Sequence, residues 1–175
     1  MGQFTIYFGS VVQLVRALPC HGRSCGFESR PTRSMSLTYK DLFKLGAFPF
    51  LVYMFNTTFQ TVAFDFYYKY SVDTLAHFFG GLAIAYSASY ALFLMEREKW
   101  IKIQKDILKA AIVIGAVMTF AVLWEFYEFI YDLSLWGDVM QPSVADTIKD
   151  LCMGMIGAVV FSYLFIYLKI DKRTG

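Results

Sequence analysis

Two glutamates stand at the end of a long apolar stretch. The run from Ala110 to Trp124 contains no charged residue. Glu125 follows it directly, and Glu128 comes three residues later. Apolar segments of this length indicate membrane spans. A carboxylate at the end of a span is costly unless it faces protein or water, so it marks a candidate functional site. Residues three apart share one face of a helix, and Asp132 continues that face. These residues indicate a membrane-embedded polar site.

Acids and a histidine take similar positions on two other predicted spans. Asp73 and His77 are four residues apart on one span, and Asp146 and Asp150 are four apart on another. Small residues let helices approach closely in lipid. Both polar faces continue through such residues, so we expect these faces to pack together and the polar groups to converge near the outer surface. The continuing residues are Gly80, Gly81 and Ile84 on the first face, and Gly154 and Gly157 on the second.

Clustered carboxylates in a half-dry pocket cannot all remain ionised, so they share protons, pair with a cation or bind a metal. Oxygen ligands with one imidazole suit Mg²⁺, Mn²⁺, Ca²⁺ or Zn²⁺. Three of the residues are also catalytic candidates, since a spare carboxylate or the imidazole can act as a general base: Glu125, His77 and Asp150. The candidate metal ligands are Asp73, His77, Glu125, Glu128, Asp146 and Asp150.

Three functions fit such a site. The first is an enzyme that carries out metal-assisted chemistry on a lipid or isoprenoid headgroup at the outer leaflet. The second is an ion-coupled or proton-coupled small transporter, although no internal repeat is visible. The third is an assembly or partner-binding protein whose buried acids serve a structural role. The chain carries no nucleophilic serine or cysteine motif, phosphate loop or dinucleotide fingerprint, and its net charge of +2 does not indicate nucleic acid. The sequence leaves a homo-oligomer open.

Composition predicts the elements that must position these residues. The 175 residues are 57% apolar and 19% aromatic, with a mean hydropathy of +0.48. A soluble domain averages about 45–50% apolar residues. The excess falls in blocks, which predicts an all-α fold: a four-helix transmembrane bundle in the cell (plasma or inner) membrane. The predicted spans are residues 42–64, 75–95, 107–131 and 147–168, with residues 65–74 as a short link.

Charge predicts the orientation of this bundle. Basic residues collect before the first span, between the second and third, and after the fourth. The positive-inside rule then places both termini in the cytoplasm. The first span is the least apolar, because it includes Lys44, Asn56 and Gln60. Asn56 and Gln60 share a face, which favours hydrogen bonds between helices.

Several polar residues have purely structural alternatives. Asp73 or Ser71 could cap a helix, and residues 143–146 fit a capping box that begins at Ser143. Glu128 could face headgroup water. Four aromatic residues lie where an interfacial belt belongs: Trp124, Tyr127, Tyr131 and Trp136.

The first 34 residues differ from the rest. Residues 11–23 and 26–31 resemble the conceptual translation of a tRNA gene, since the T-arm consensus reads Phe-Glu-Ser in one frame and that tripeptide occurs at Phe27–Ser29. We therefore predict that residues 1–34 are a non-native or disordered extension from a mis-called start. The native chain would be one helical membrane domain from Met35 to Gly175.

The polar motifs together resemble those of a known family. They are Asp73-x3-His77-Phe78-x-Gly80, Trp124-Glu125-x2-Glu128, Gly137-Asp138-Val139 and Asp146-Thr147-x2-Asp150 with Gly157-Ala158. This pattern looks like the YjdF-type inner-membrane family and, more distantly, the VanZ-like small membrane proteins. Met140–Ala145 separate two motifs that stand almost together in the family pattern. The resemblance implies a multi-pass helical membrane protein with these polar residues as its hallmark, and it leaves the chemistry open.

Overall fold

The computed structural model describes residues 3–6, 35–134 and 143–174, and the chain forms two compact units, residues 1–41 and 42–175. In the first unit, β1 (Gln3–Ile6) pairs antiparallel with β2 (Met35–Thr38). Thr38 then caps the next helix: its backbone N–H donates to Oδ2 of Asp41 at 3.0 Å, and the N–H of Asp41 donates to Oγ1 of Thr38 at 3.3 Å. This reciprocal pair is a capping box. Residues 7–34, on which most of the start-site prediction falls, lie outside the described residues.

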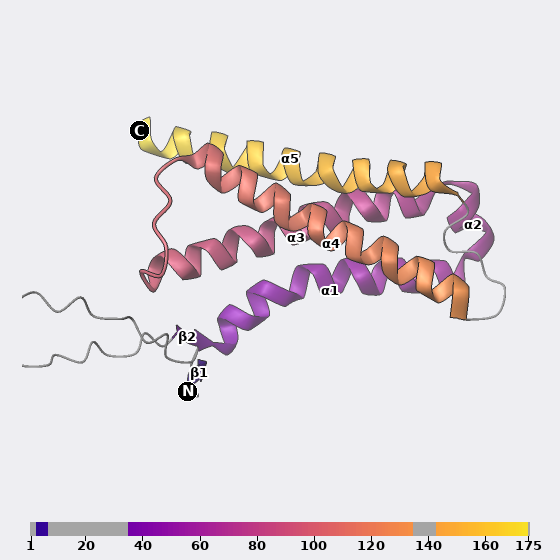
Figure 1. The fold of residues 1–175 in the computed structure, drawn as a ribbon, viewed down its shortest axis with the longest axis horizontal. Helices are drawn as coiled ribbons and strands as arrows, with labels where there is room; N and C mark the ends of the chain where they lie inside the picture. Colours follow the sequence, from indigo (N-terminus) through magenta and orange to yellow (C-terminus); the bar gives the residue numbers. More distant parts are fainter. Residues whose placement is uncertain (1–2, 7–34, 135–142, 175) are drawn as a thin grey trace, which may run out of the picture. The chain divides into compact units, whose positions relative to one another are not determined.

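The described chain is almost entirely helical after β2, so the predicted all-α class is confirmed (Figure 1). The helices are α1 (Tyr39–Val62), α2 (Phe64–Lys69), α3 (Val72–Arg97), α4 (Asp106–Ser134) and α5 (Val144–Thr174).

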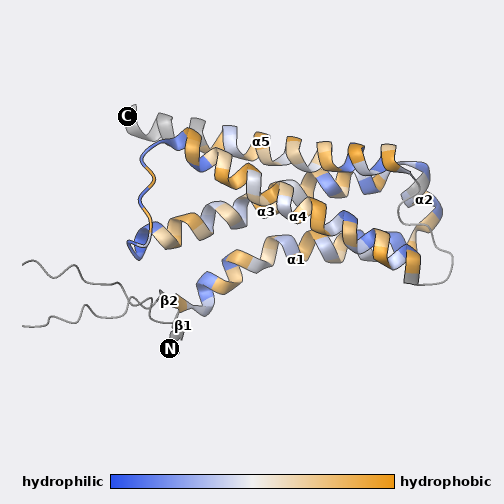
Figure 2. Cartoon of the chain, in the orientation of Figure 1, coloured by the Kyte–Doolittle hydropathy of each residue, from blue (hydrophilic) through white to orange (hydrophobic). Residues whose placement is uncertain are grey.

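Three of the described helices, α3, α4 and α5, are long and apolar enough to cross a membrane. Figure 2 shows hydrophobic residues along them and hydrophilic residues where α3 leads into the link to α4. These helices contain the whole of the predicted spans 75–95, 107–131 and 147–168. With 24 residues, α1 extends over roughly 36 Å and is therefore long enough to span as well. However, its polar residues lower its hydropathy, and it is not among the three.

The link predicted at residues 65–74 is not a simple loop, because most of it is the short helix α2. Asp65 lies in the first turn of α2 and Lys69 in the last. Each charge therefore stands at the helix end where the helix dipole favours it. Ser71 precedes α3 in the left-handed conformation, with a φ of 50° and no side-chain cap hydrogen bond. Asp73 lies in the first turn of α3 and is thus not the cap.

Glycines bring α3 and α5 into close contact. A Cβ added to Gly157 would lie 3.0 Å from the backbone nitrogen of Leu82 and closer still to the carbonyl oxygen of Phe78. Similarly, a Cβ on Gly81 would overlap the backbone of Gly154. Small residues permit this approach in lipid. As predicted, the helix faces that carry the polar residues also pack together, through Gly81, Gly154 and Gly157.

A small apolar cluster holds α4 against this pair; its buried members are Ala85, Val113, Val117 and Ala158. The chain runs along α3, returns along α4 and runs forward again along α5. The starts of α3 and α5 and the end of α4 therefore meet at one end of these three helices, where the acids lie (Figure 1).

Helix α1 contacts α3 and α4 through one hydrogen bond to its backbone and one aromatic pair. The hydroxyl of Ser87 donates to the carbonyl oxygen of Leu45 at 2.7 Å. The rings of Tyr53 and Trp124 meet edge to face with centroids 6.1 Å apart. These contacts place one face of α1 beside α3 and α4.

Candidate functional site

His77 stands at the centre of a cluster of acids from three helices. One set of ligand atoms comes from Asp73, His77 and Asp150, and a second from His77, Glu125 and Glu128. Within each set the atoms lie within 4.8 Å of one another. Glu125, Glu128 and Asp150 are 4%, 5% and 2% exposed. The structure thus brings five of the six predicted ligands into two overlapping groups.

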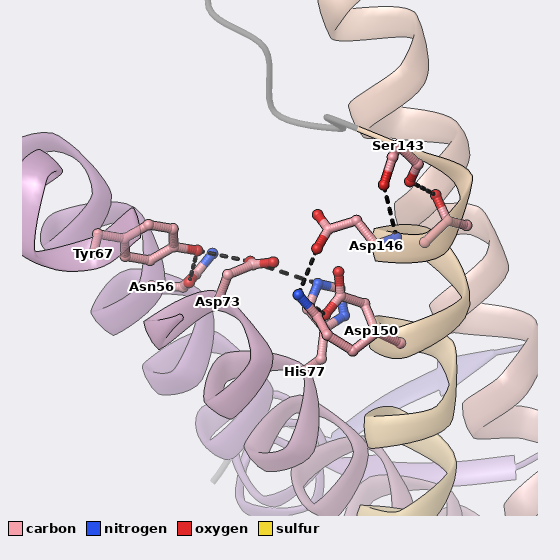
Figure 3. A network of polar contacts seen from close by, with 9 residues as sticks. Asn56, Tyr67, Asp73, His77, Ser143, Asp146 and Asp150 are labelled. Atoms are coloured by element: carbon pink, nitrogen blue, oxygen red, sulfur yellow. Dashed lines mark hydrogen bonds and ion pairs between the residues drawn. The ribbon is translucent and has the colours of Figure 1, made fainter. Parts of the chain in front are cut away.

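The Asp73 side of the cluster is fixed by a hydrogen-bond network that reaches α1 and α2 (Figure 3). Nε2 of His77 lies 3.6 Å from Oδ1 of Asp73. The hydroxyl of Tyr67 lies 2.7 Å from the same oxygen and 2.7 Å from Oδ1 of Asn56. Its single proton can be donated to either. Asn56 therefore forms a hydrogen bond between helices, as its position on the first predicted span favours.

Tyr67 is well suited to donate. It is 2% exposed, and its burial, followed by the neighbouring carboxylate of Asp73, raises the pKa of Tyr67 well above its ordinary value. The hydroxyl therefore stays protonated and can orient the carboxylate of Asp73 toward His77.

On α4, Trp124 is bound to the acid that follows it one turn later. Nε1 of Trp124 donates to Oε1 of Glu128 at 2.7 Å. Glu128 is buried, so the alternative in which it faces headgroup water is wrong. Trp124 is predicted to belong to an interfacial aromatic belt, but its indole also forms a hydrogen bond with Glu128. Tyr127 is 47% exposed, which is compatible with the predicted belt.

On α5, Asp150 is the most deeply buried acid of the cluster. Its Oδ1 is buried and accepts no hydrogen bond from the described residues. The side chain of Lys149 is 42% exposed, and its Nζ is 3.8 Å from that oxygen. Lys149 makes a closer ion pair with Asp146. Ser143 caps the helix by accepting from the N–H of Asp146 at 3.2 Å, which is half of the predicted capping box.

An apolar cavity of about 240 Å³ adjoins the cluster and has His77 in its wall. Residues from α1, α3, α4 and α5 line it. Most of the lining is aliphatic, aromatic or glycine, and Asn56 and His77 supply polar side chains. The cluster and the cavity thus share a boundary at His77.

The sequence of the chain matches one known protein family. Residues 38–171 match the model of a family described as predicted membrane protein (DUF2238). The chain belongs to the DUF2238 family. Neither a curated protein nor a solved structure matches it.

In this DUF2238 protein some predicted residues lie outside the two ligand sets. Asp146 pairs with Lys149. Asp132, which is expected to continue the face of Glu125 and Glu128, is half-exposed near the end of α4. Asp138 and Trp136 lie outside the described residues.

Sequence reasoning missed Tyr67, which the DUF2238 protein uses to hold Asp73. The residue falls in the expected link, among other aromatic residues, and no periodicity singles it out. Its position six residues before Asp73 becomes meaningful only when α2 folds back. The only sequence feature that could have suggested α2 is weak: Asp65 and Lys69 stand at the positions that favour the start and the end of a short helix.

Proposed function

We propose that this DUF2238 protein binds a divalent metal ion in the cluster around His77 and uses it in chemistry on the polar headgroup of a lipid. The observation that carries the proposal is the pair of ligand sets that share His77. Each combines two carboxylates with one imidazole and joins residues far apart in the chain.

The spacing of the ligand atoms suits one ion in either set. Ca²⁺ keeps oxygen ligands about 2.3–2.6 Å away, whereas Zn²⁺ keeps its ligands about 2.0–2.2 Å away, so two ligands on opposite sides of Zn²⁺ are at most about 4.4 Å apart. The atoms of each set lie within 4.8 Å of one another. Binding of Mn²⁺ or Zn²⁺ would draw the ligand atoms of the occupied set closer together.

The charge balance also favours a cation. Among the described residues, Lys149 is the lysine in contact with the cluster, and it is bound mainly to Asp146. A buried carboxylate without a partner is expensive. The buried Oδ1 of Asp150, which accepts no hydrogen bond, is the group whose cost a bound cation would remove most directly.

The donor set narrows the choice of ion. Carboxylates alone would suit Mg²⁺ or Ca²⁺, whereas an imidazole nitrogen is a better ligand for Mn²⁺ or Zn²⁺. Since His77 belongs to both sets, we assign Mn²⁺ or Zn²⁺ as the preferred ion. A bound ion would polarise a phosphoryl or acyl oxygen, and a carboxylate of the other set would serve as general base.

The membrane setting points to a lipid substrate. The cluster lies at one end of three helices that are long and apolar enough to span a bilayer. At the ends of membrane-spanning helices, the cluster would lie at the depth of the lipid headgroups. In this proposal α1 is a fourth span, both termini are cytoplasmic, the site faces the outer leaflet of the cell membrane, and the family is of the YjdF type.

Metal analysis of the detergent-purified full chain tests the proposal. We expect about one Mn²⁺ or Zn²⁺ per chain, and a loss of at least tenfold in affinity in whichever of Glu125→Gln and Asp150→Asn removes a ligand of the occupied set. Asp65→Asn is the matched control, because Asp65 is an exposed carboxylate at the same end of the helices. Wild-type-like metal content in both site variants would refute the metal site.

Stability separates this function from a purely structural role. Without metal, Asp150→Asn should stabilise the fold, because it removes a buried carboxylate whose Oδ1 accepts no hydrogen bond from the described residues and has only a distant, half-exposed lysine nearby. With saturating Mn²⁺ the order should reverse, because only the wild type gains binding energy. An order that does not depend on Mn²⁺ would favour structural acids. Absence of metal together with proton-linked flux in vesicles would favour a carrier.

A further inference from the structure

We infer that the apolar cavity beside His77 holds the hydrocarbon chain of the substrate, which is a single-chain lipid with an anionic head, or one chain of a larger lipid. The inference deepens the proposed function and rests on it for the headgroup. The arrangement behind it is a cavity with apolar walls and a polar end.

The lining favours a hydrocarbon over water. Water is held in cavities that offer it two to four polar partners, whereas apolar cavities bind apolar guests. Here the indole N–H of Trp124, which lines the cavity, already donates to Glu128. The amide oxygen of Asn56 lies 2.7 Å from the hydroxyl of Tyr67, whose proton it shares with Asp73, so Asn56 and His77 form a polar part of the wall. The remaining wall is formed by residues such as Val52, Ile84, Val117 and Phe120.

The cavity has apolar walls and a polar boundary at His77, which matches the hydrocarbon chain and the polar head of an amphiphile. His77 lies both in the cavity wall and in the two ligand sets. A chain that fills the cavity would therefore present its first polar atoms to the ligand sets. An anionic head, such as a phosphate or carboxylate, would complete the coordination of a bound cation.

The volume sets the length of chain that fits. A cavity of about 150 Å³ accommodates benzene, which gives roughly 25 Å³ per carbon atom. The present cavity of about 240 Å³ would then hold about ten carbon atoms. Carbons beyond this length would lie outside the cavity, of which α1 forms one wall through Pro49, Val52 and Tyr53.

Gly80 provides a way to fill the cavity without disturbing the backbone. It lines the cavity, and a Cβ at this position meets no atom within 4 Å. Gly80→Leu would add roughly 100 Å³ of side chain at the same volume per carbon. Gly115 is the matched control, because it is also a helical glycine with open space around it, but it does not line the cavity.

Fluorescence quenching measures occupancy, because Trp124 lines the cavity. The full chain carrying Trp100→Phe and Trp136→Phe leaves Trp124 as the reporter. The protein is placed in phosphatidylcholine nanodiscs and titrated with decyl phosphate that carries two bromine atoms on its chain. We expect saturable quenching above the linear background from lipid partitioning. Gly80→Leu should weaken it at least tenfold, and Gly115→Leu should leave it unchanged.

Chain length and metal provide independent arms. Affinity should rise from the hexyl to the decyl phosphate and then level off, because the cavity is full. Quenching that is not saturable, or that is equal in Gly80→Leu and Gly115→Leu, would overturn the inference whatever the metal content. If no metal binds but the saturable, Gly80-dependent quenching persists, the chain site stands and the proposed metal chemistry fails.

Discussion

The close contact between α3 and α5 gives a quantitative prediction for Gly157→Ala. The new Cβ would lie 3.0 Å from the nitrogen of Leu82 and nearer to the carbonyl oxygen of Phe78. Both atoms are backbone, so the helices themselves must separate. Overpacking of this kind costs about 1–3 kcal/mol. Replacing a helical glycine with alanine otherwise gains about 0.5–1 kcal/mol.

The control Gly115→Ala isolates the contact, because a Cβ there meets nothing within 4 Å. Both variants receive the same gain in helix propensity, so the difference between their free energies of unfolding should be about 1–3 kcal/mol. The measurement is denaturant unfolding in mixed micelles, followed by circular dichroism. Equal stability of the two variants would refute the close approach of α3 and α5.

Gly157→Ala should also weaken metal binding. Phe78 follows His77 directly on α3, and Gly157 lies two turns after Asp150 on α5. A separation of the helices at this contact therefore moves Asp150 away from His77. A Mn²⁺ titration of both glycine variants checks this, and only Gly157→Ala should lose affinity.

Two further predictions concern groups around the cluster. Tyr67→Phe should destabilise the fold by about 1–3 kcal/mol, because it removes the hydroxyl beside Asp73 and Asn56, and exposed Tyr70→Phe should be neutral. The folded-state pKa of Tyr67 is raised. The free energy of unfolding should therefore fall as pH rises above about 10, where an unfolded tyrosine ionises. When unfolding is measured against pH, the free energy of unfolding of Tyr67→Phe should fall less steeply. Lys149→Gln should tighten Mn²⁺ binding roughly threefold to tenfold in calorimetry, because it removes a positive charge 3.8 Å from Asp150. Weaker binding would contradict the placement of the ion near Asp150.

Much of the fold could be predicted from local properties. The apolar blocks predict α3, α4 and α5, since helix length in a bilayer is set by its thickness. The four-residue spacing of Asp73 and His77 predicts a shared face, and so does that of Asp146 and Asp150. The first predicted span is less well determined, because length and hydropathy give different answers for α1.

The sequence by itself determined which residues are polar in an apolar context and which helical face each occupies, because helical periodicity and hydropathy are local. Only the tertiary structure decided that His77 belongs to two ligand sets and that Tyr67 reaches Asp73. These depend on distances between separate helices, which are set by the glycine contacts of α3 with α5 and by the turn through α2.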